Sequence, residues 1–157
     1  MVKMLEKIQM TVGVLFLSLF FITILIQIAT RYLGISVIWT EEVANYSFIW
    51  AIFMGASVMV NRKEHFSFDY FSRKLEGKKR ATLMLVIDGI VLLFAISLVV
   101  YGFQAVTTFW DYNWLAFPSL KMGYIWLSIP VMGATMSIYS ISHILKNIGL
   151  LREKVSS

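Results

Sequence analysis

The sequence predicts an all-α integral membrane protein with four transmembrane helices, and two observations carry this prediction. The first is hydropathy: 59% of the 157 residues are hydrophobic, and the mean hydropathy is +0.75. The second is that four long apolar stretches each contain no basic residue and at most one acidic residue. At about 1.5 Å per residue, each stretch is long enough to cross a hydrocarbon core of roughly 30 Å. The predicted spans are residues 8–30, 42–61, 82–107 and 122–145.

Basic residues lie almost entirely outside these spans, and their distribution predicts the orientation. Of the 14 Lys and Arg residues, two precede the first span, seven lie in the central connector 62–81 and three follow the fourth span. The other two connectors hold one each, Arg31 and Lys121. Because basic loops stay in the cytoplasm, both termini and the central connector are expected on the inner side. The whole chain, residues 1–157, is expected to form a single membrane domain.

Composition and motifs exclude several other classes of protein. The net charge of +5 could favour nucleic acid, but the positive charges cluster where anionic lipid headgroups attract them. Membrane lipids are therefore expected as partners and nucleic acid is not. The chain has no cysteine, which excludes disulfides and Cys-ligated metals. It also lacks a phosphate-binding Gly-rich loop, a His/Glu metal motif and a nucleophile triad, so neither an enzymatic activity nor a cofactor is expected.

The start of the second span carries an unusual polar group, Trp39-Thr40-Glu41-Glu42. Thr40 is expected to cap the helix, and the two acids suit the positive end of its dipole. Arg31, at the end of the first span, is a natural ion-pair partner across the outer turn. Two interpretations stay open: the acids only complement the helix dipole, or they form a fixed polar clamp within this chain or with a partner.

Small residues form a stripe along the second span. Ala44, Ser47, Ala51 and Gly55 are spaced three and four residues apart, which places them on one helix face. Small side chains allow another helix to approach closely in a membrane. The approaching helix could belong to a partner protein or to the same bundle, and the sequence favours neither.

Asp88 is the one acid well inside a predicted span. It could form a cation or proton site, but a salt bridge or hydrogen bond to a neighbouring helix end is favoured, because Asp88 lies nearer the inner face than the bilayer centre. His65 and His143 are the only histidines, and haem held between them is a further alternative. The position of His65 in a charged connector argues against haem.

Two further features concern local structure. In the central connector, Phe68, Phe71 and Leu75 share the spacing of a short interfacial helix that lies along the inner leaflet. In the fourth span, Pro130 is expected to kink the helix or to lie where a neighbour satisfies the freed carbonyl.

The order of these residues resembles a known family. Arg31, then Trp39-x-Glu41-Glu42, then Phe53-x-Gly55-Ala56, then His65 with Asp69 four residues later, is similar to the small, DctQ-like membrane subunit of tripartite ATP-independent periplasmic (TRAP) transporters. The resemblance covers nearly the whole chain. It implies a multi-pass protein of the bacterial or archaeal inner membrane.

The resemblance also implies a function and partners. A periplasmic substrate-binding protein would capture an organic acid such as sialic acid or a C4-dicarboxylate. A large membrane subunit would carry the transport and sodium sites. The small subunit would widen the static scaffold and help the binding protein to dock. Two rival interpretations are a membrane anchor of a redox complex and a small exporter that acts alone as a dimer; the exporter would need a midplane acid, which the first two spans lack.

Overall fold

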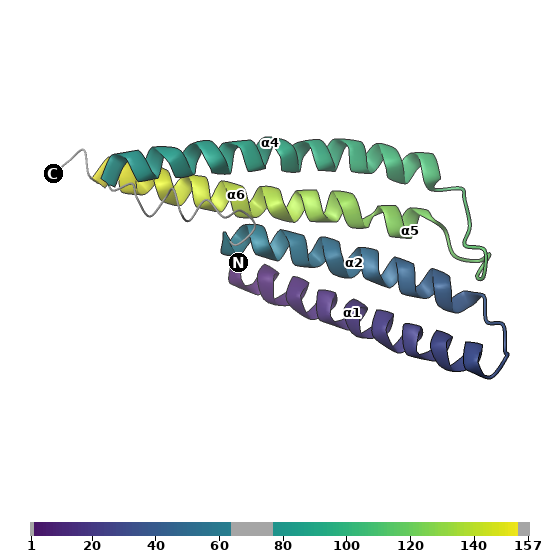
Figure 1. Cartoon of the computed structure of the whole chain (residues 1–157). Helices are drawn as coiled ribbons and strands as arrows, with labels where there is room; N and C mark the ends of the chain where they lie inside the picture. The colour runs from purple at the N-terminus through teal and green to yellow at the C-terminus, as the bar shows by residue number, and fades with distance from the viewer. Residues whose placement is uncertain (1, 64–76, 154–157) are drawn as a thin grey trace.

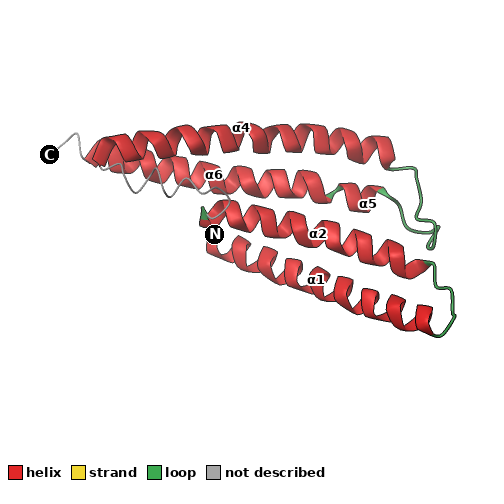
Figure 2. Cartoon of the chain, viewed as in Figure 1, coloured by secondary structure: helices red, strands yellow, loops and turns green. Residues whose placement is uncertain are grey.

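The computed structural model describes residues 2–63 and 77–153, and most of this part of the chain is helical (Figures 1 and 2). Four helices are long and apolar enough to cross a membrane. No strand occurs in the described ranges, so the predicted all-α fold is confirmed. The long helices are α1 (Val2–Tyr32), α2 (Trp39–Arg62), α4 (Gly77–Phe109) and α6 (Ser128–Glu153), and a one-turn helix, α5 (Gly123–Trp126), precedes α6.

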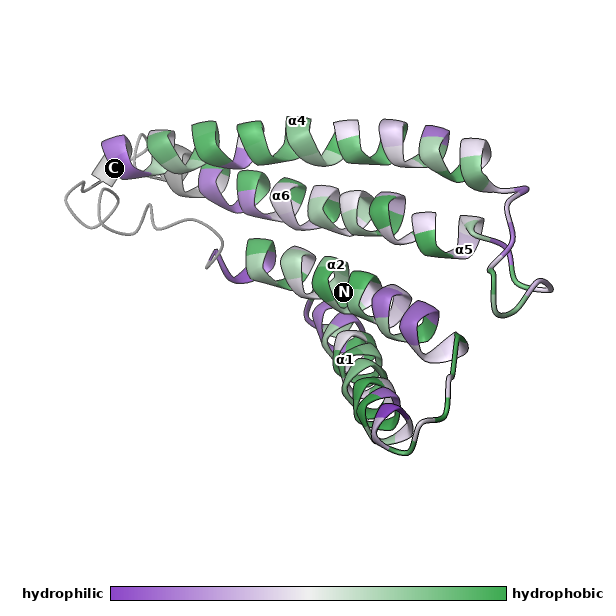
Figure 3. Cartoon of the chain, turned by 45° about the vertical axis from the view of Figure 1, so that its right-hand side comes forward, coloured by the Kyte–Doolittle hydropathy of each residue, from purple (hydrophilic) through white to green (hydrophobic). Residues whose placement is uncertain are grey.

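The four long helices form a row rather than a closed bundle. Helix α2 packs against α6 in the middle, α1 packs on the outer side of α2, and α4 packs on the outer side of α6 (Figure 1). Helices α1 and α4 do not contact each other in the described residues. Both edge helices therefore leave many large apolar side chains exposed. Figure 3 shows by colour that the two helices are largely hydrophobic. Lipid or a partner protein must cover these surfaces.

The row has two ends, which we name by their connections. At the terminal end lie the start of α1, the end of α2, the start of α4 and the end of α6 (Figure 1). At the loop end lie the two short connectors, residues 33–38 and 110–122. The predicted orientation would place the terminal end inside the cell, but which end faces the cytoplasm stays a prediction.

Close packing between α4 and α6 depends on two glycines. A side chain at Gly133 would place its Cβ 2.8 Å from the Ala95 carbonyl oxygen of α4. On the other helix, a Cβ at Gly102 would lie 2.8 Å from the ring of Pro130. Because glycine has only a hydrogen atom in place of a side chain, the two backbones can approach closely. Inside lipid, where the hydrophobic effect does not drive helices together, such van der Waals contact stabilises the helix pair.

The two local predictions have different outcomes. The fourth span is interrupted at Leu127, between α5 and α6, in the turn that precedes Pro130. A proline disturbs a helix in this preceding turn, through its ring and its missing N–H, so the break agrees with the expected effect of Pro130. Thr40 does not cap α2, because the helix begins one residue earlier; its buried hydroxyl instead donates to the Val37 carbonyl oxygen at 3.0 Å.

Candidate functional site: polar contacts between the helices

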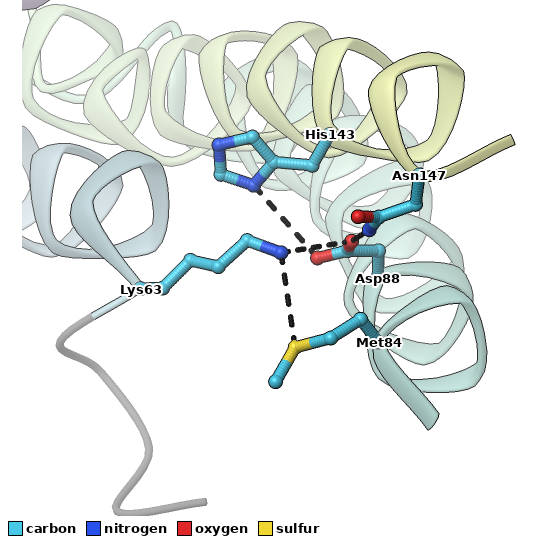
Figure 4. A network of polar contacts seen from close by, with 5 residues as sticks. All are labelled: Lys63, Met84, Asp88, His143 and Asn147. Atoms are coloured by element: carbon cyan, nitrogen blue, oxygen red, sulfur yellow. Dashed lines mark hydrogen bonds and ion pairs between the residues drawn. The ribbon is translucent and has the colours of Figure 1, made fainter. Parts of the chain in front are cut away.

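At the terminal end, a polar network joins α2, α4 and α6 around Asp88 (Figure 4). Asp88 is buried, and the residue as a whole is 6% exposed. The Lys63 ammonium lies 3.1 Å from Asp88 Oδ2, and the Asn147 amide donates to the same oxygen at 2.9 Å. His143 Nδ1 lies 3.8 Å from the other carboxylate oxygen. Asp88 thus has the neighbours that a salt bridge between helix ends requires, and Lys63 is a partner that the sequence did not identify.

Lys63 reaches Asp88 from an uncommon backbone conformation. It follows the last residue of α2 with a φ of 59°, in the left-handed region that glycine usually occupies. Its backbone N–H donates to the Val60 carbonyl oxygen at 3.1 Å, which closes the helix end. A non-glycine residue there costs of order 1 kcal/mol, so the surrounding contacts must hold it in place.

A second polar cluster lies inside the apolar region and centres on Gln9 of α1, which is 4% exposed. The Gln9 amide donates to the Ser57 hydroxyl of α2 at 2.7 Å and to the Thr135 hydroxyl of α6 at 2.9 Å. The Tyr139 hydroxyl of α6 donates to the Gln9 carbonyl oxygen. One amide therefore joins three helices, and its bonding capacity fixes their relative rotation and depth.

One turn closer to the chain start, Glu6 extends this cluster toward the terminal end. Its carboxylate accepts from Arg62 Nε at 2.7 Å and from the Asn61 amide at 2.8 Å. Because Glu6 and Gln9 are three residues apart on α1, and Ser57 and Asn61 are four apart on α2, the contacts form a ladder along the α1–α2 contact. The N-terminal half of α1 is thus held by polar bonds.

At the loop end, Glu42 holds the connector 110–122. Its two carboxylate oxygens accept the backbone N–H groups of Leu115 and Ala116, each at 2.8 Å. Nearby, the Tyr46 and Trp114 rings meet edge to face with centroids 4.5 Å apart. The carboxylate therefore acts as a clamp within the chain, but on backbone groups rather than on a basic side chain.

The other predicted residues of the loop end are placed differently from the expected clamp. Arg31 forms no ion pair with any acid in the described ranges 2–63 and 77–153. Glu41 is exposed in the first turn of α2, where it complements the helix dipole. Trp39 is partly exposed at the start of the same helix. The structure thus brings Glu42 to the connector and leaves Arg31 and Glu41 at the surface.

The stripe of small residues on α2 divides into two parts. Ala44 and Ser47 are almost fully buried within the chain, at 2% and 3% exposed. Further along, Gly13 of α1 approaches the stripe, and its Cβ position lies 3.8 Å from the Ala51 carbonyl oxygen and 4.0 Å from the Gly55 nitrogen. A Cβ on Gly55 itself would meet no atom within 4 Å in the described structure. Contact within the bundle accounts for most of the stripe, and a partner contact at Gly55 stays a prediction.

Three predicted features cannot be placed. His65, Asp69 and the interfacial helix of the central connector lie in residues 64–76, outside the described residues. The haem interpretation needs His65, so the structure offers no test of it. Among the described residues, no group of three His, Asp or Glu side chains could hold a metal ion.

Among the residues that join the helices, Gln9 is the one that the sequence indicates most weakly. The sequence shows only that it is one of a few polar residues in an apolar span and that it lies near the charged start of α1. The sequence could not reveal its partners, because Ser57, Thr135 and Tyr139 lie on helices whose relative rotation has no sequence signature. The polar contacts described above bind helices to one another, which is a structural role.

A comparison with protein families identifies the family of the chain. The family described as "Tripartite ATP-independent periplasmic transporters, DctQ component" matches residues 10–149, which is most of the chain. The chain belongs to this family and is a small permease subunit of a TRAP transporter in the inner membrane. As predicted, it is a transporter component and not an enzyme. Membership of this family argues against the alternative of a redox membrane anchor.

Two curated proteins show how the chain relates to other members of the family. The sialic acid TRAP transporter small permease protein SiaQ of Vibrio cholerae is 30% identical over 128 residues, which cover 80% of this chain and 72% of SiaQ. A putative TRAP transporter small permease protein of Haemophilus influenzae is 34% identical over 80 residues, which cover 49% of this chain and 48% of that protein.

Proposed function

We propose that this chain is the static scaffold subunit of a sodium-coupled TRAP transporter that imports an organic acid, and that the large membrane subunit carries the solute and sodium sites. The observation that carries this proposal is the use of the buried polar groups. Asp88 is the only charged residue among the buried residues of the described structure, and it is engaged with Lys63 and Asn147. Gln9 is fully engaged as well. A solute or ion pathway would need such groups to be free.

Reconstitution tests the scaffold role. Proteoliposomes that hold the large subunit, this chain and the periplasmic protein should accumulate the solute when sodium is present outside, and replacement of sodium by potassium should abolish uptake. Proteoliposomes that hold this chain alone should transport nothing. Uptake by this chain alone would contradict the proposal and would favour a self-sufficient small transporter.

Sialic acid is the first substrate to test, and C4-dicarboxylates are the second. The choice is supported by the name of the Vibrio cholerae relative, and the similarity covers most of both chains. Calorimetry can measure the binding of each acid to the periplasmic protein of the same transporter. The acid that binds is the substrate. Micromolar binding of a dicarboxylate with no binding of sialic acid would exclude the first choice.

We infer the N-in, C-in orientation from the distribution of basic residues. The absence of native cysteine allows a direct test with single cysteines. Cysteines at Ser36 and Ser119, which are exposed in the two loop-end connectors, should react with a membrane-impermeant thiol reagent in intact cells. A cysteine at Gly149, near the end of α6, should react only after the membrane is opened. The reverse labelling pattern would overturn the orientation.

We further propose that the loop end helps the periplasmic protein to dock. The proposal is supported by the way Glu42 fixes the backbone at Leu115 and Ala116, while the Leu115 side chain remains 80% exposed. A fixed apolar side chain outside the helices is suited to a protein contact. Leu115→Asp should weaken binding of the periplasmic protein to the membrane complex, and Ser36→Asp in the other connector should not. Equal binding by both variants would remove Leu115 from the docking surface.

A further inference from the structure

The outward face of α4 carries a line of polar side chains in its second half. Ser97, Tyr101, Gln104 and Thr108 follow one another at spacings of four, three and four residues, and we name this line the α4 seam. Tyr101 is 67% exposed, Gln104 and Thr108 are exposed, and Ser97 is half-buried. The opposite face of α4 packs on α6 through Ala95 and Gly102. Because its residues are mostly exposed, the seam faces away from α5 and α6, the helices that α4 contacts in the described part of the chain.

The polar groups of the α4 seam differ in whether the chain itself satisfies them. The Ser97 hydroxyl donates to the Phe94 carbonyl oxygen at 2.7 Å, and the Thr108 hydroxyl donates to the Gln104 carbonyl oxygen at 2.8 Å. The side-chain amide of Gln104 makes no hydrogen bond with any described residue, and neither does the Tyr101 hydroxyl. An amide has two N–H donors and an acceptor oxygen, so Gln104 carries the largest unmet demand.

The position of Gln104 makes this demand costly in lipid. It lies five residues before Phe109, the last residue of α4, so its Cα is about 8 Å below the helix end. Helical side chains lean toward the N-terminus of their helix, and the N-terminus of α4 is at the terminal end. The amide therefore leans toward the membrane interior and away from the water at the loop end. An amide without a hydrogen-bond partner in hydrocarbon is strongly disfavoured.

We propose that the α4 seam packs against a transmembrane helix of the large membrane subunit, and that Gln104 forms hydrogen bonds across this contact. The proposal rests on the scaffold function proposed above. A spacing of four, three and four residues is the pattern of a left-handed helix pair that crosses at about 20°. Helix α4 is at the edge of the row, so a partner helix can lie along its whole length. Helices α2 and α6 are flanked on both sides by helices of this chain.

Photo-crosslinking in the assembled complex tests the seam directly. A photoreactive phenylalanine analogue is placed singly at Tyr101, Gln104 or Thr108, and at Ile96 and Phe103, which are exposed on α4 but lie about 80–100° around the helix from Gln104. Adducts with the large subunit are expected from the three seam positions and not from the two controls. Adducts between two copies of this chain, or adducts from the controls alone, would overturn the proposal.

A substitution measures what the amide contributes. Gln104→Leu should weaken recovery of the large subunit, by about threefold in the association constant for each hydrogen bond lost. Phe103→Leu, on the neighbouring exposed position, should leave recovery unchanged. If Gln104 faced lipid, Gln104→Leu would leave recovery unchanged or raise it, and the proposal would be wrong. Failure of the unmodified chain to bind the large subunit at all would instead contradict the scaffold function, so the two failures are distinguishable.

Discussion

Removal of Lys63 should destabilise the helix row, because it leaves the buried Asp88 carboxylate without its cationic partner. The perturbation is Lys63→Met, which keeps the length of the aliphatic side chain and deletes the charge. The Asn147 amide remains as the main hydrogen-bond donor to the carboxylate. Asp88→Asn is the complementary change, because it keeps the shape of the side chain and leaves Lys63 with an amide partner.

The magnitude follows from the burial of the two partners. At 3.1 Å and an effective dielectric constant near 20, the gross attraction is about 5 kcal/mol. Desolvation offsets much of it, and loss of one partner of a fully buried pair costs about 3–5 kcal/mol. The Asp88 side chain is 9% exposed, but that of Lys63 is 39% exposed, so water already screens the ammonium. We therefore expect Lys63→Met to cost about 2 kcal/mol and Asp88→Asn about 1 kcal/mol.

Thermal unfolding of the purified chain in detergent checks these values. A loss of about 2 kcal/mol in a chain of this size lowers the midpoint by roughly 4–8 °C. The double variant should be more stable than the sum of the single losses predicts, because no charge is left unpaired. Lys79→Met, which removes an exposed charge from the same end, is the control. Equal midpoints for Lys63→Met and Lys79→Met would refute the ion pair as a stabilising contact.

Three further predictions concern contacts along the row. Gln9→Leu removes three hydrogen bonds between helices at about 0.6 kcal/mol each, so it should lower the unfolding midpoint by several degrees; no change would mean that Gln9 is replaceable packing. Glu42→Gln should increase proteolysis of the connector 110–122 while Glu41→Gln does not, and equal digestion would exclude the clamp. Gly13→Leu should destabilise the chain, because a Cβ at Gly13 would already lie 3.3 Å from the Cβ of Met54 on α2. Gly55→Ala should not, and equal unfolding midpoints for the two variants would refute close packing at Gly13.

The helices were predictable because lipid leaves a spanning backbone few alternatives. Every peptide group inside hydrocarbon must bond within its own segment, so an apolar stretch of sufficient length becomes a helix. The predicted spans 8–30, 42–61 and 82–107 accordingly lie inside α1, α2 and α4. The order of the helices in the row was not predictable, because apolar surfaces that face lipid and those that face another helix have similar composition.

The sequence predicted some of the polar residues that are important for contacts between the helices and connectors, but it did not predict their hydrogen-bond and ion-pair partners. Glu42 stood out as an acid at the edge of a span, yet its partners are backbone N–H groups of a connector, which carry no side-chain signal. Arg31 was the nearest basic residue in sequence, and this proximity suggested a pair that the structure does not contain among the described residues. Likewise the sequence presents Lys63 only as one of several connector charges, because its left-handed backbone and its reach toward Asp88 are properties of the folded chain.

The open row of helices and the polar contacts between them have a common physical origin. Inside lipid, apolar contact between helices gains little over contact with lipid tails, so a row of apolar helices needs directional bonds to keep its order. Asp88, Gln9 and Glu42 supply such bonds at the terminal end, within the apolar region and at the loop end. A closed bundle would bury the surfaces of α1 and α4, whereas a row fixed by these bonds keeps both edges available. A subunit that enlarges the scaffold of a larger protein requires such an edge, and Gln104 marks the edge at which lipid is the less favourable neighbour.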